Sequence, residues 1–188
     1  MPERVEEIQA AHPGQRIEVW FQDEARIGQQ GTMTRQWGIR GERLTVPLQT
    51  GYEWVYLIGA TCPQTGNSLA LALPQANTEM MNRFLKKLAA AMNLDTHLIL
   101  VWDGAAWHRS KTLVIPKNIS LVSLPPYSPE LNPVERIWRY LRSHFLSNRL
   151  FKNYHAILEA VCDAWNQFTL DPQRVASVTS VSWLLAYN

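Results

Sequence analysis

The sequence predicts an α/β domain in which helices cover a mixed sheet, and three observations support this fold class. Apolar and polar residues alternate along RIEVWFQDEARIG, residues 16–28, with the period of two that indicates a strand. Residues 97–103, HLILVWD, form a nearly continuous apolar run typical of a strand buried on both faces. Between them, residues 78–93 repeat apolar side chains at helical spacing.

The remaining elements follow from similar patterns in chain order. A helix over residues 2–12 ends at His12-Pro13-Gly14, and short apolar segments after the first strand predict further strands. These strands span about 34–40, 43–49, 53–61 and 68–73, and another covers 119–124. Helices are predicted at about 133–147, 154–168 and 172–186. Since no repeat or linker interrupts the 188 residues, we expect one domain.

The bulk composition is that of an ordinary globular protein, with 46% apolar and 18% charged residues. A formal net charge of only +2 does not by itself indicate a nucleic-acid partner. No apolar run reaches the roughly 20 residues needed to span a membrane, and the charged N-terminus lacks a signal peptide. Cys62 and Cys162 are far apart and fit reduced thiols. We therefore expect a cytoplasmic protein.

Three carboxylates stand at predicted structural junctions. Asp23 lies on or just after the first strand, Asp103 lies at the end of the central strand, and Glu135 lies in the first turn of a helix. Two unit charges about 4 Å apart repel by roughly 4 kcal/mol at an effective dielectric near 20, and a divalent cation removes that repulsion. Ligands that are all oxygen favour Mg²⁺ or Mn²⁺ over zinc.

The stretch LPPYSPELNPVERIW, residues 124–138, also fits a purely structural role for Glu135. Asn132 is a good N-cap residue, Pro133 suits the first helical position, and Glu135 would then complete a capping box. The two roles are compatible, because the positive end of the helix dipole favours an ionised Glu135.

The aspartates have structural alternatives as well. Asp103 is followed by Gly104, a pair that also forms plain turns, and the pair Asp23-Glu24 is equally common at a solvated strand end. Residue types alone therefore leave both interpretations open.

Three blocks of the chain resemble the catalytic domain of DDE transposases, in the bacterial insertion-sequence branch of the mariner superfamily. They are VWFQDEARIG, LILVWDGAAWHRSK and LPPYSPELNPVERIW, and the likeness extends over residues 16–170. It implies a ribonuclease H-like fold, with a mixed five-stranded sheet flanked by helices. It also implies a catalytic and metal-binding triad of Asp23, Asp103 and Glu135. Glu130 is the competing candidate for the third acid, in place of Glu135.

The chemistry implied by this resemblance is cleavage of DNA at transposon ends, followed by strand transfer into target DNA. Two Mg²⁺ or Mn²⁺ ions would assist, one activating a water molecule and the other stabilising the leaving 3′-oxygen. Asp103 would bridge both ions. Accessory roles are expected for His108, Asn132 and Glu24. Basic residues close to the acids are expected to contact DNA phosphates, and they are Arg109, Lys111, Arg136, Arg139 and Arg142.

The expected partners are the double-stranded DNA of the transposon ends and of the target. Family members carry N-terminal helix-turn-helix modules, so residues 1–15 are interpreted as the remnant of a linker helix. Residues 16–188 then form the catalytic domain, and the DNA-recognition module is missing or encoded separately. A homodimer on paired ends is a further expectation. The alternatives are a catalytically silent remnant that binds DNA or a partner, a general ribonuclease H-like nuclease, and a two-carboxylate glycosidase.

Overall fold

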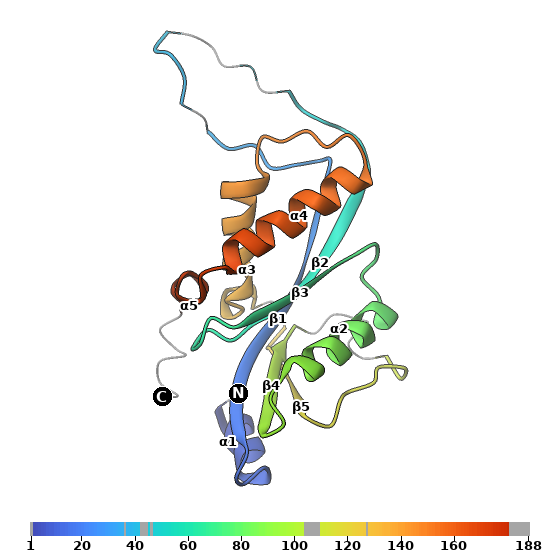
Figure 1. The fold of residues 1–188 in the computed structure, drawn as a ribbon, viewed down its shortest axis with the longest axis vertical. Helices are drawn as coiled ribbons and strands as arrows, with labels where there is room; N and C mark the ends of the chain where they lie inside the picture. Colours follow the sequence, from blue (N-terminus) through green and yellow to red (C-terminus); the bar gives the residue numbers. More distant parts are fainter. Residues whose placement is uncertain are drawn as a thin grey trace.

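A computed structural model describes residues 2–35, 37–41, 45, 47–103, 110–126 and 128–180. Its centre is a five-stranded mixed sheet with strand order β3-β2-β1-β4-β5 (Figure 1). β1 pairs in parallel with β4, and β4 with β5, whereas β2 is antiparallel to both β1 and β3. The strands are β1 (Arg16–Gly28), β2 (Trp54–Thr61), β3 (Ser68–Leu73), β4 (Thr96–Trp102) and β5 (Ile119–Ser123).

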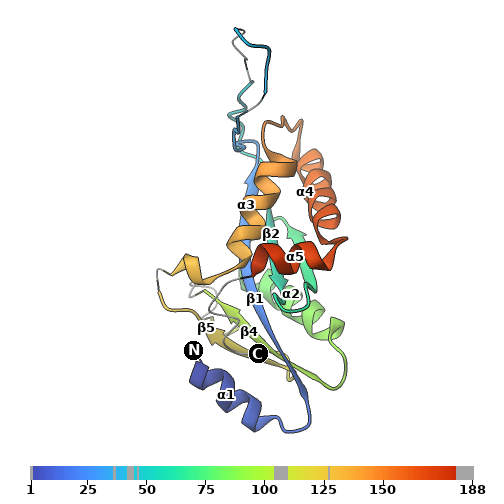
Figure 2. The same cartoon turned by 90° about the vertical axis from the view of Figure 1, so that its left-hand side faces the viewer.

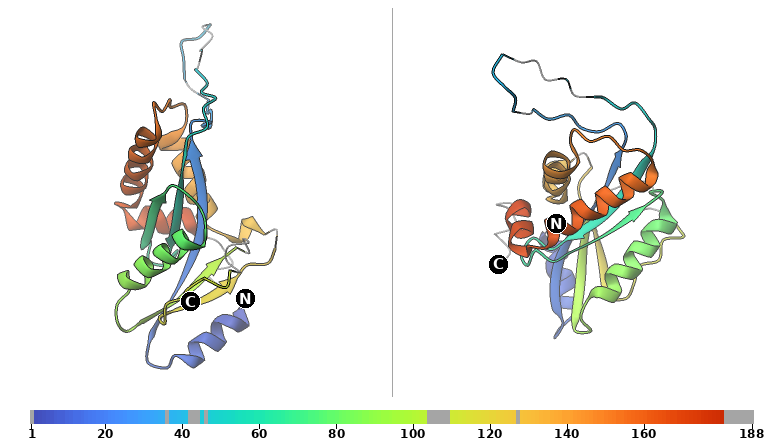
Figure 3. Two further views of the ribbon diagram at one scale, coloured as in Figure 1. Left: turned by 90° about the vertical axis from the view of Figure 1, so that its right-hand side faces the viewer. Right: turned by 45° about the horizontal axis from the view of Figure 1, so that its top comes forward.

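Helices cover both faces of this sheet. Among the described helices, α2 packs on one face, and the others pack on the opposite face (Figures 2 and 3). The helices are α1 (Pro2–Ala11), α2 (Thr78–Ala91), α3 (Val134–Leu141), α4 (Tyr154–Thr169) and α5 (Pro172–Thr179). A 3₁₀ turn, η2 (Pro129–Leu131), precedes α3, and a π-helical turn, η3 (Arg142–Leu146), continues it. Each predicted helix is thus confirmed, although residues 181–186 of the last one lie outside the described residues.

Alternation along the strands divides the apolar residues between two cores. In β4 the side chains of Leu98, Leu100 and Trp102 join the α2 core, whereas Ile99 and Val101 join the other. All seven residues of this strand are buried. The prediction that residues 97–103 contain a strand covered on both faces is therefore confirmed.

β1 is much longer than its neighbours and changes its partners along its length. Its first residues pair with β4 as far as Phe21 and Val101, and the residues from Phe21 onward pair with β2. Beyond Phe21, no strand formed by the described residues pairs with β1 on the edge where β4 was its partner, and we call this place the notch. This notch lies at the carboxyl end of β4, where α/β sheets tend to form their sites.

The connection between β1 and β2 contradicts part of the sequence prediction. Strands were expected at about 34–40 and 43–49, but the described residues there form no strand. The described parts of this segment extend away from the sheet (Figures 1 and 3), so no strand of the sheet lies beside them to act as a pairing partner. Its base is fixed by Asn148, whose side chain accepts from the Thr34 N–H at 3.1 Å and donates to the Thr34 carbonyl at 3.1 Å.

Two sequence-based expectations concern the chain as a whole. Both cysteines are free thiols, Cys62 buried and Cys162 partly buried. Within the parts of the chain that the structure describes, no helix combines the length and apolar character needed to cross a membrane.

Gly66, in the turn between β2 and β3, is expected to be intolerant of a side chain. Its φ is +73°, and a Cβ there would collide with the Pro172 carbonyl at the start of α5. We expect Gly66→Ala to lower the free energy of unfolding by about 2–4 kcal/mol, measured by urea denaturation. Gly14→Ala is the matched control, because its φ is +83° but no atom lies within 4 Å of its Cβ position. The control should cost only about 1 kcal/mol, and equal losses would contradict the steric argument.

Candidate active site

The first two candidate acids meet at the notch between β1 and β4. The last β1–β4 pair joins Phe21 to Val101. Asp23 is two residues beyond Phe21, and Asp103 is two residues beyond Val101, so the same register places the two aspartates side by side. Neighbouring strands are about 4.8 Å apart, which is close enough for carboxylates to share a ligand.

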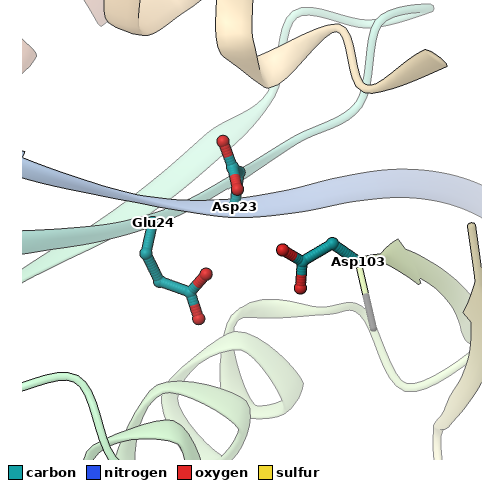
Figure 4. Close-up of side chains that lie close together, drawn as sticks. All are labelled: Asp23, Glu24 and Asp103. Atoms are coloured by element: carbon teal, nitrogen blue, oxygen red, sulfur yellow. The ribbon is translucent and has the colours of Figure 1, made fainter. Parts of the chain in front are cut away.

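The structure adds Glu24 to this pair. One carboxylate oxygen each from Asp23, Glu24 and Asp103 lies within 4.8 Å of the others. Asp23 and Glu24 leave opposite faces of β1, and the Asp103 carboxylate approaches both from the side (Figure 4). Asp23 is buried, Glu24 is half-buried and Asp103 is exposed. Three oxygen donors with graded access to solvent suit a hard divalent cation.

Glu135 approaches the cluster from α3, on the Asp23 side of β1. It lies in the first turn of α3 and is close enough to raise the pKa of Asp23 by charge repulsion. It is not among the three residues whose oxygens lie within 4.8 Å of one another. The structure thus brings Asp23 and Asp103 together and places Glu135 next to Asp23.

Asn132 fixes the start of α3 against β1. Its side-chain amide donates to the Gln22 carbonyl at 2.9 Å, one residue beyond the last β1–β4 pair, and its carbonyl oxygen accepts from the Val134 N–H. The predicted capping box is wrong, because the Asn132 N–H donates to the Pro129 carbonyl instead of Glu135, and α3 begins at Val134. The buried Asn132 therefore joins the two elements that carry Asp23 and Glu135.

Asp23 is strongly perturbed by its surroundings. Burial, together with repulsion from Glu135 and Glu24, raises the pKa of Asp23 from 3.8 to about 7. A hydrogen bond of 2.7 Å from the Trp138 indole N–H to Asp23 Oδ2 acts in the opposite direction. A carboxylate at such a position favours any cation that can replace the missing solvent.

A cleft of about 760 Å³ opens beside Glu135, between α3, η2 and the base of the β1–β2 connection. Several predicted residues line it: Glu130, Asn132, Glu135, Arg136, Arg139 and Arg142. Arg136 is partly committed, since it donates to the Ser180 carbonyl at 2.7 Å. The exposed Lys111 lies between β4 and β5. His108 and Arg109 fall outside the described residues.

Gln22 is an unusual neighbour of the acids. Its side chain is fully buried, yet neither amide atom has a hydrogen-bond partner within the described part of the chain. Leaving such a group unpaired costs about 1–3 kcal/mol. Most buried polar groups in native proteins are paired, so Gln22 is an exception among the described residues.

Comparison with known proteins identifies the family of this chain. Residues 18–158 match the family model described as DDE superfamily endonuclease. The chain belongs to this family, and the matched range contains the candidate acids at positions 23, 103 and 135.

Two relatives come from bacteria. The chain is 41% identical over 130 residues to the uncharacterized protein y4pE/y4sA of Sinorhizobium fredii, with 69% of this chain and 96% of that protein covered. It is 26% identical over 161 residues to the insertion element IS630 uncharacterized 39 kDa protein of Shigella sonnei. That match covers 84% of this chain but only 46% of the relative, so the chain spans about half of the IS630 protein.

Solved structures of the Mos1 transposase share the fold. The Mos1 strand transfer complex matches with a TM-score of 0.64 at 17% identity, over 94% of this chain and 53% of that one. The Mos1 paired-end complex with the left transposon end gives 0.65 at 15% identity, over 94% and 55%. At this identity the likeness concerns the fold alone, and it confirms the predicted ribonuclease H-like, five-stranded architecture of transposase catalytic cores.

The raised pKa of Asp23 gives a prediction about metal-free protein. Between pH 4 and 7 the unfolded chain loses this proton while the folded protein retains it, so wild-type stability falls as the pH rises. Asp23→Asn removes the charge and keeps an acceptor for Trp138. We expect the free energy of unfolding of Asp23→Asn minus that of wild type to be about 2–3 kcal/mol larger at pH 8 than at pH 5, so the variant gains relative stability as the pH rises.

Urea denaturation in EDTA at the two pH values measures this difference. Glu79→Gln is the control, because Glu79 is exposed on α2, where its ion pair with Arg83 is accessible to solvent. A relative stability of Asp23→Asn that does not change with pH would show that Asp23 is not held protonated by its surroundings.

Proposed function

We propose that this chain is the catalytic domain of an insertion-sequence transposase, which cleaves DNA at transposon ends and transfers the strand to target DNA. The observation that carries the proposal is the meeting of Asp23 and Asp103 at the end of β4, with Glu135 beside Asp23 on α3. Family membership supports the reaction class. Because the chain covers about half of the IS630 protein and of Mos1, the whole protein's activity belongs to this proposal.

We further propose that Mg²⁺ or Mn²⁺ binds to these acids. The donors are carboxylate oxygens only, and the buried Asp23 has a pKa that burial and neighbouring acids raise to about 7, so a divalent cation is the natural counter-charge. Mos1 complexes with Mn and with Mg exist as solved structures of the same fold. Two bound ions would supply the activation of the attacking water and the stabilisation of the leaving oxygen.

The chain's own residues then have distinct roles. Asp103 is the exposed member of the cluster, its carboxylate approaches both Asp23 and Glu24, and it is assigned the role of serving both ions. Asp23 is held on one side by Trp138, and Glu135 approaches on that same side. Glu24 leaves the other face of β1 and is assigned an accessory role. Asn132 keeps the distance between β1 and α3 fixed.

The cleft beside Glu135 is proposed as the path of the DNA backbone. Arg139 and Arg142 line it on α3 and η3, so a phosphate group there would lie next to the acids. Arginine forms bidentate hydrogen bonds with phosphate oxygens. Such contacts position DNA without recognising its base sequence. Recognition of transposon ends is assigned to a helix-turn-helix module, and pairing of two ends to a homodimer on DNA.

The division of the chain remains a proposal as well. Residues 16–188 are proposed as the catalytic domain, with residues 1–15 as the remnant of a linker helix. In the structure, Val5 and Ile8 of α1 are buried in the same core as α3 and α4. This packing fixes the position of α1 relative to the sheet.

Removal of the acids tests the reaction. With Mn²⁺ and labelled duplex carrying the element's own terminal repeats, we expect Asp103→Asn and Glu135→Gln each to reduce cleavage by about 10³-fold. The loss reflects several kcal/mol of charge stabilisation in the transition state. Glu24→Gln is the matched comparison, since it removes an acid of the same cluster and should retain measurable cleavage.

The outcomes separate the competing functions. If wild type and Asp103→Asn cleave equally, the assigned site is wrong. If Glu24→Gln does not cleave DNA while Glu135→Gln does, the third acid is Glu24. Preferential cleavage of RNA–DNA hybrids over duplex DNA would favour the general nuclease, and binding without cleavage would favour the silent remnant.

The proposed DNA path predicts a change in salt dependence. Arg139→Ala and Arg142→Ala should each weaken binding of duplex DNA and lower the slope of log affinity against log salt concentration by about 1. Fluorescence anisotropy between low and moderate salt measures the slope. Lys87→Ala is the control, because Lys87 is exposed on α2, across the sheet from the cleft. Equal slopes for all four proteins would contradict the path.

A further inference from the structure

Trp138 has two roles in the structure, of which the sequence pattern indicates only one. Its ring is buried on the apolar side of α3, with 1% of its surface exposed, as a core residue should be. Its indole N–H, however, donates to Asp23 Oδ2 at 2.7 Å, across 115 positions of sequence. Glu135 and Trp138 are three residues apart on α3, so one turn of helix presents both groups to Asp23.

The indole is held in place from the β2 side. Gly59 is the direct partner of Asp23 across the β1–β2 pair. A Cβ on Gly59 would lie 2.8 Å from Trp138 Cη2 and 3.3 Å from Trp165 Cη2. The absence of a side chain at Gly59 therefore lets Trp138 lie against the sheet at the height of Asp23. Trp165 packs on the same ring, with centroids 6.0 Å apart.

We propose that Trp138 is a positioning residue for metal binding: it fixes one carboxylate oxygen of Asp23 and leaves the other to ligate the cation. The proposal rests on the function proposed above, because it takes Asp23 as a metal ligand. It adds Gly59 as the residue that makes room for the donor.

The chemistry of indole suits this task. Its N–H is a donor only, and the nitrogen offers no lone pair to a metal, so Trp138 can orient Asp23 without competing for the cation. Hydroxyl, amide and imidazole groups in the same place could also serve as ligands. Because the bond is buried, water cannot replace the lost donor in a variant. Partners of this kind, behind a metal ligand, typically change metal affinity by about 10–100-fold.

Binding of Mn²⁺ alone to the full chain tests the proposal, by calorimetry and by the electron paramagnetic resonance signal of the free ion. Two variants remove the donor: Trp138→Phe, and replacement of Trp138 by 3-benzothienylalanine, which keeps the ring shape and lacks the N–H. We expect both to bind Mn²⁺ about 10–100-fold more weakly than wild type. Thermal unfolding in EDTA shows whether each variant is folded, and the benzothienyl variant should unfold close to wild type.

Trp165→Phe is the matched control, because it alters the same packing while the hydrogen bond to Asp23 comes from Trp138. It should lose stability but keep its Mn²⁺ affinity. Unchanged affinity in the benzothienyl variant would overturn the proposal, and so would an equal loss in Trp165→Phe, which would assign the effect to packing. Failure of the wild type to bind Mn²⁺ would instead remove the proposed function itself.

A second readout separates positioning from a direct part in the reaction. If Trp138 acts through Asp23, cleavage by Trp138→Phe should recover as the Mn²⁺ concentration is raised, whereas Asp23→Asn should not recover. Cleavage by Trp138→Phe that stays low at saturating Mn²⁺ would contradict a role in metal affinity alone and overturn the proposal as stated.

Discussion

The parallel pairing of β1 with β4 is the constraint from which the candidate site follows. Its register aligns the two strands so that the first residues past the last pair include an aspartate on each. Because β4 stops while β1 continues, the carboxylates meet at an edge where the β1–β4 ladder has ended. The Gln22 carbonyl, one residue past the last β1–β4 pair, accepts a hydrogen bond from the Asn132 side chain. The place where the acids meet is therefore also the place where α3 is anchored. Slipping the pair by one residue would turn Asp103 to the other face of the sheet.

The site combines groups whose charges oppose one another in the absence of a cation. Asp23 is buried between the sheet and α3, with Glu24 and Glu135 both raising its pKa. Hydrogen bonds from the Trp138 indole and from the backbone at Glu24 act in the opposite direction and favour the ionised form of Asp23. The folded protein therefore keeps repelling acidic groups close together around Asp23 in β1, and packing of Trp138 and Trp165 against Gly59 holds this geometry. Repulsion of this kind is typical of sites that are completed by a ligand.

Much of the fold could be predicted from sequence, because β4 and the helices have strong periodic patterns. The segment at 34–49 misled the prediction, since short apolar alternation gives no information about whether a neighbouring strand exists. For the site, the position of Asp103 just past β4 was readable from sequence, whereas Asp23 lies within β1 and not after it. The alignment of the two aspartates depends on register, which no local pattern contains. The apolar stripe of α3 marked Trp138 as core, and nothing in that stripe could show where its N–H would point.

Asn148 attaches the base of the projecting segment to the helical layer. It holds Thr34 through three hydrogen bonds of 3.0–3.1 Å, and Gln29 and Gln49 both donate to the Phe151 carbonyl a few residues later. The roots of the segment are therefore fastened to the turn that links η3 with α4. The position of the segment's base is therefore coupled to the helical layer that carries Glu135.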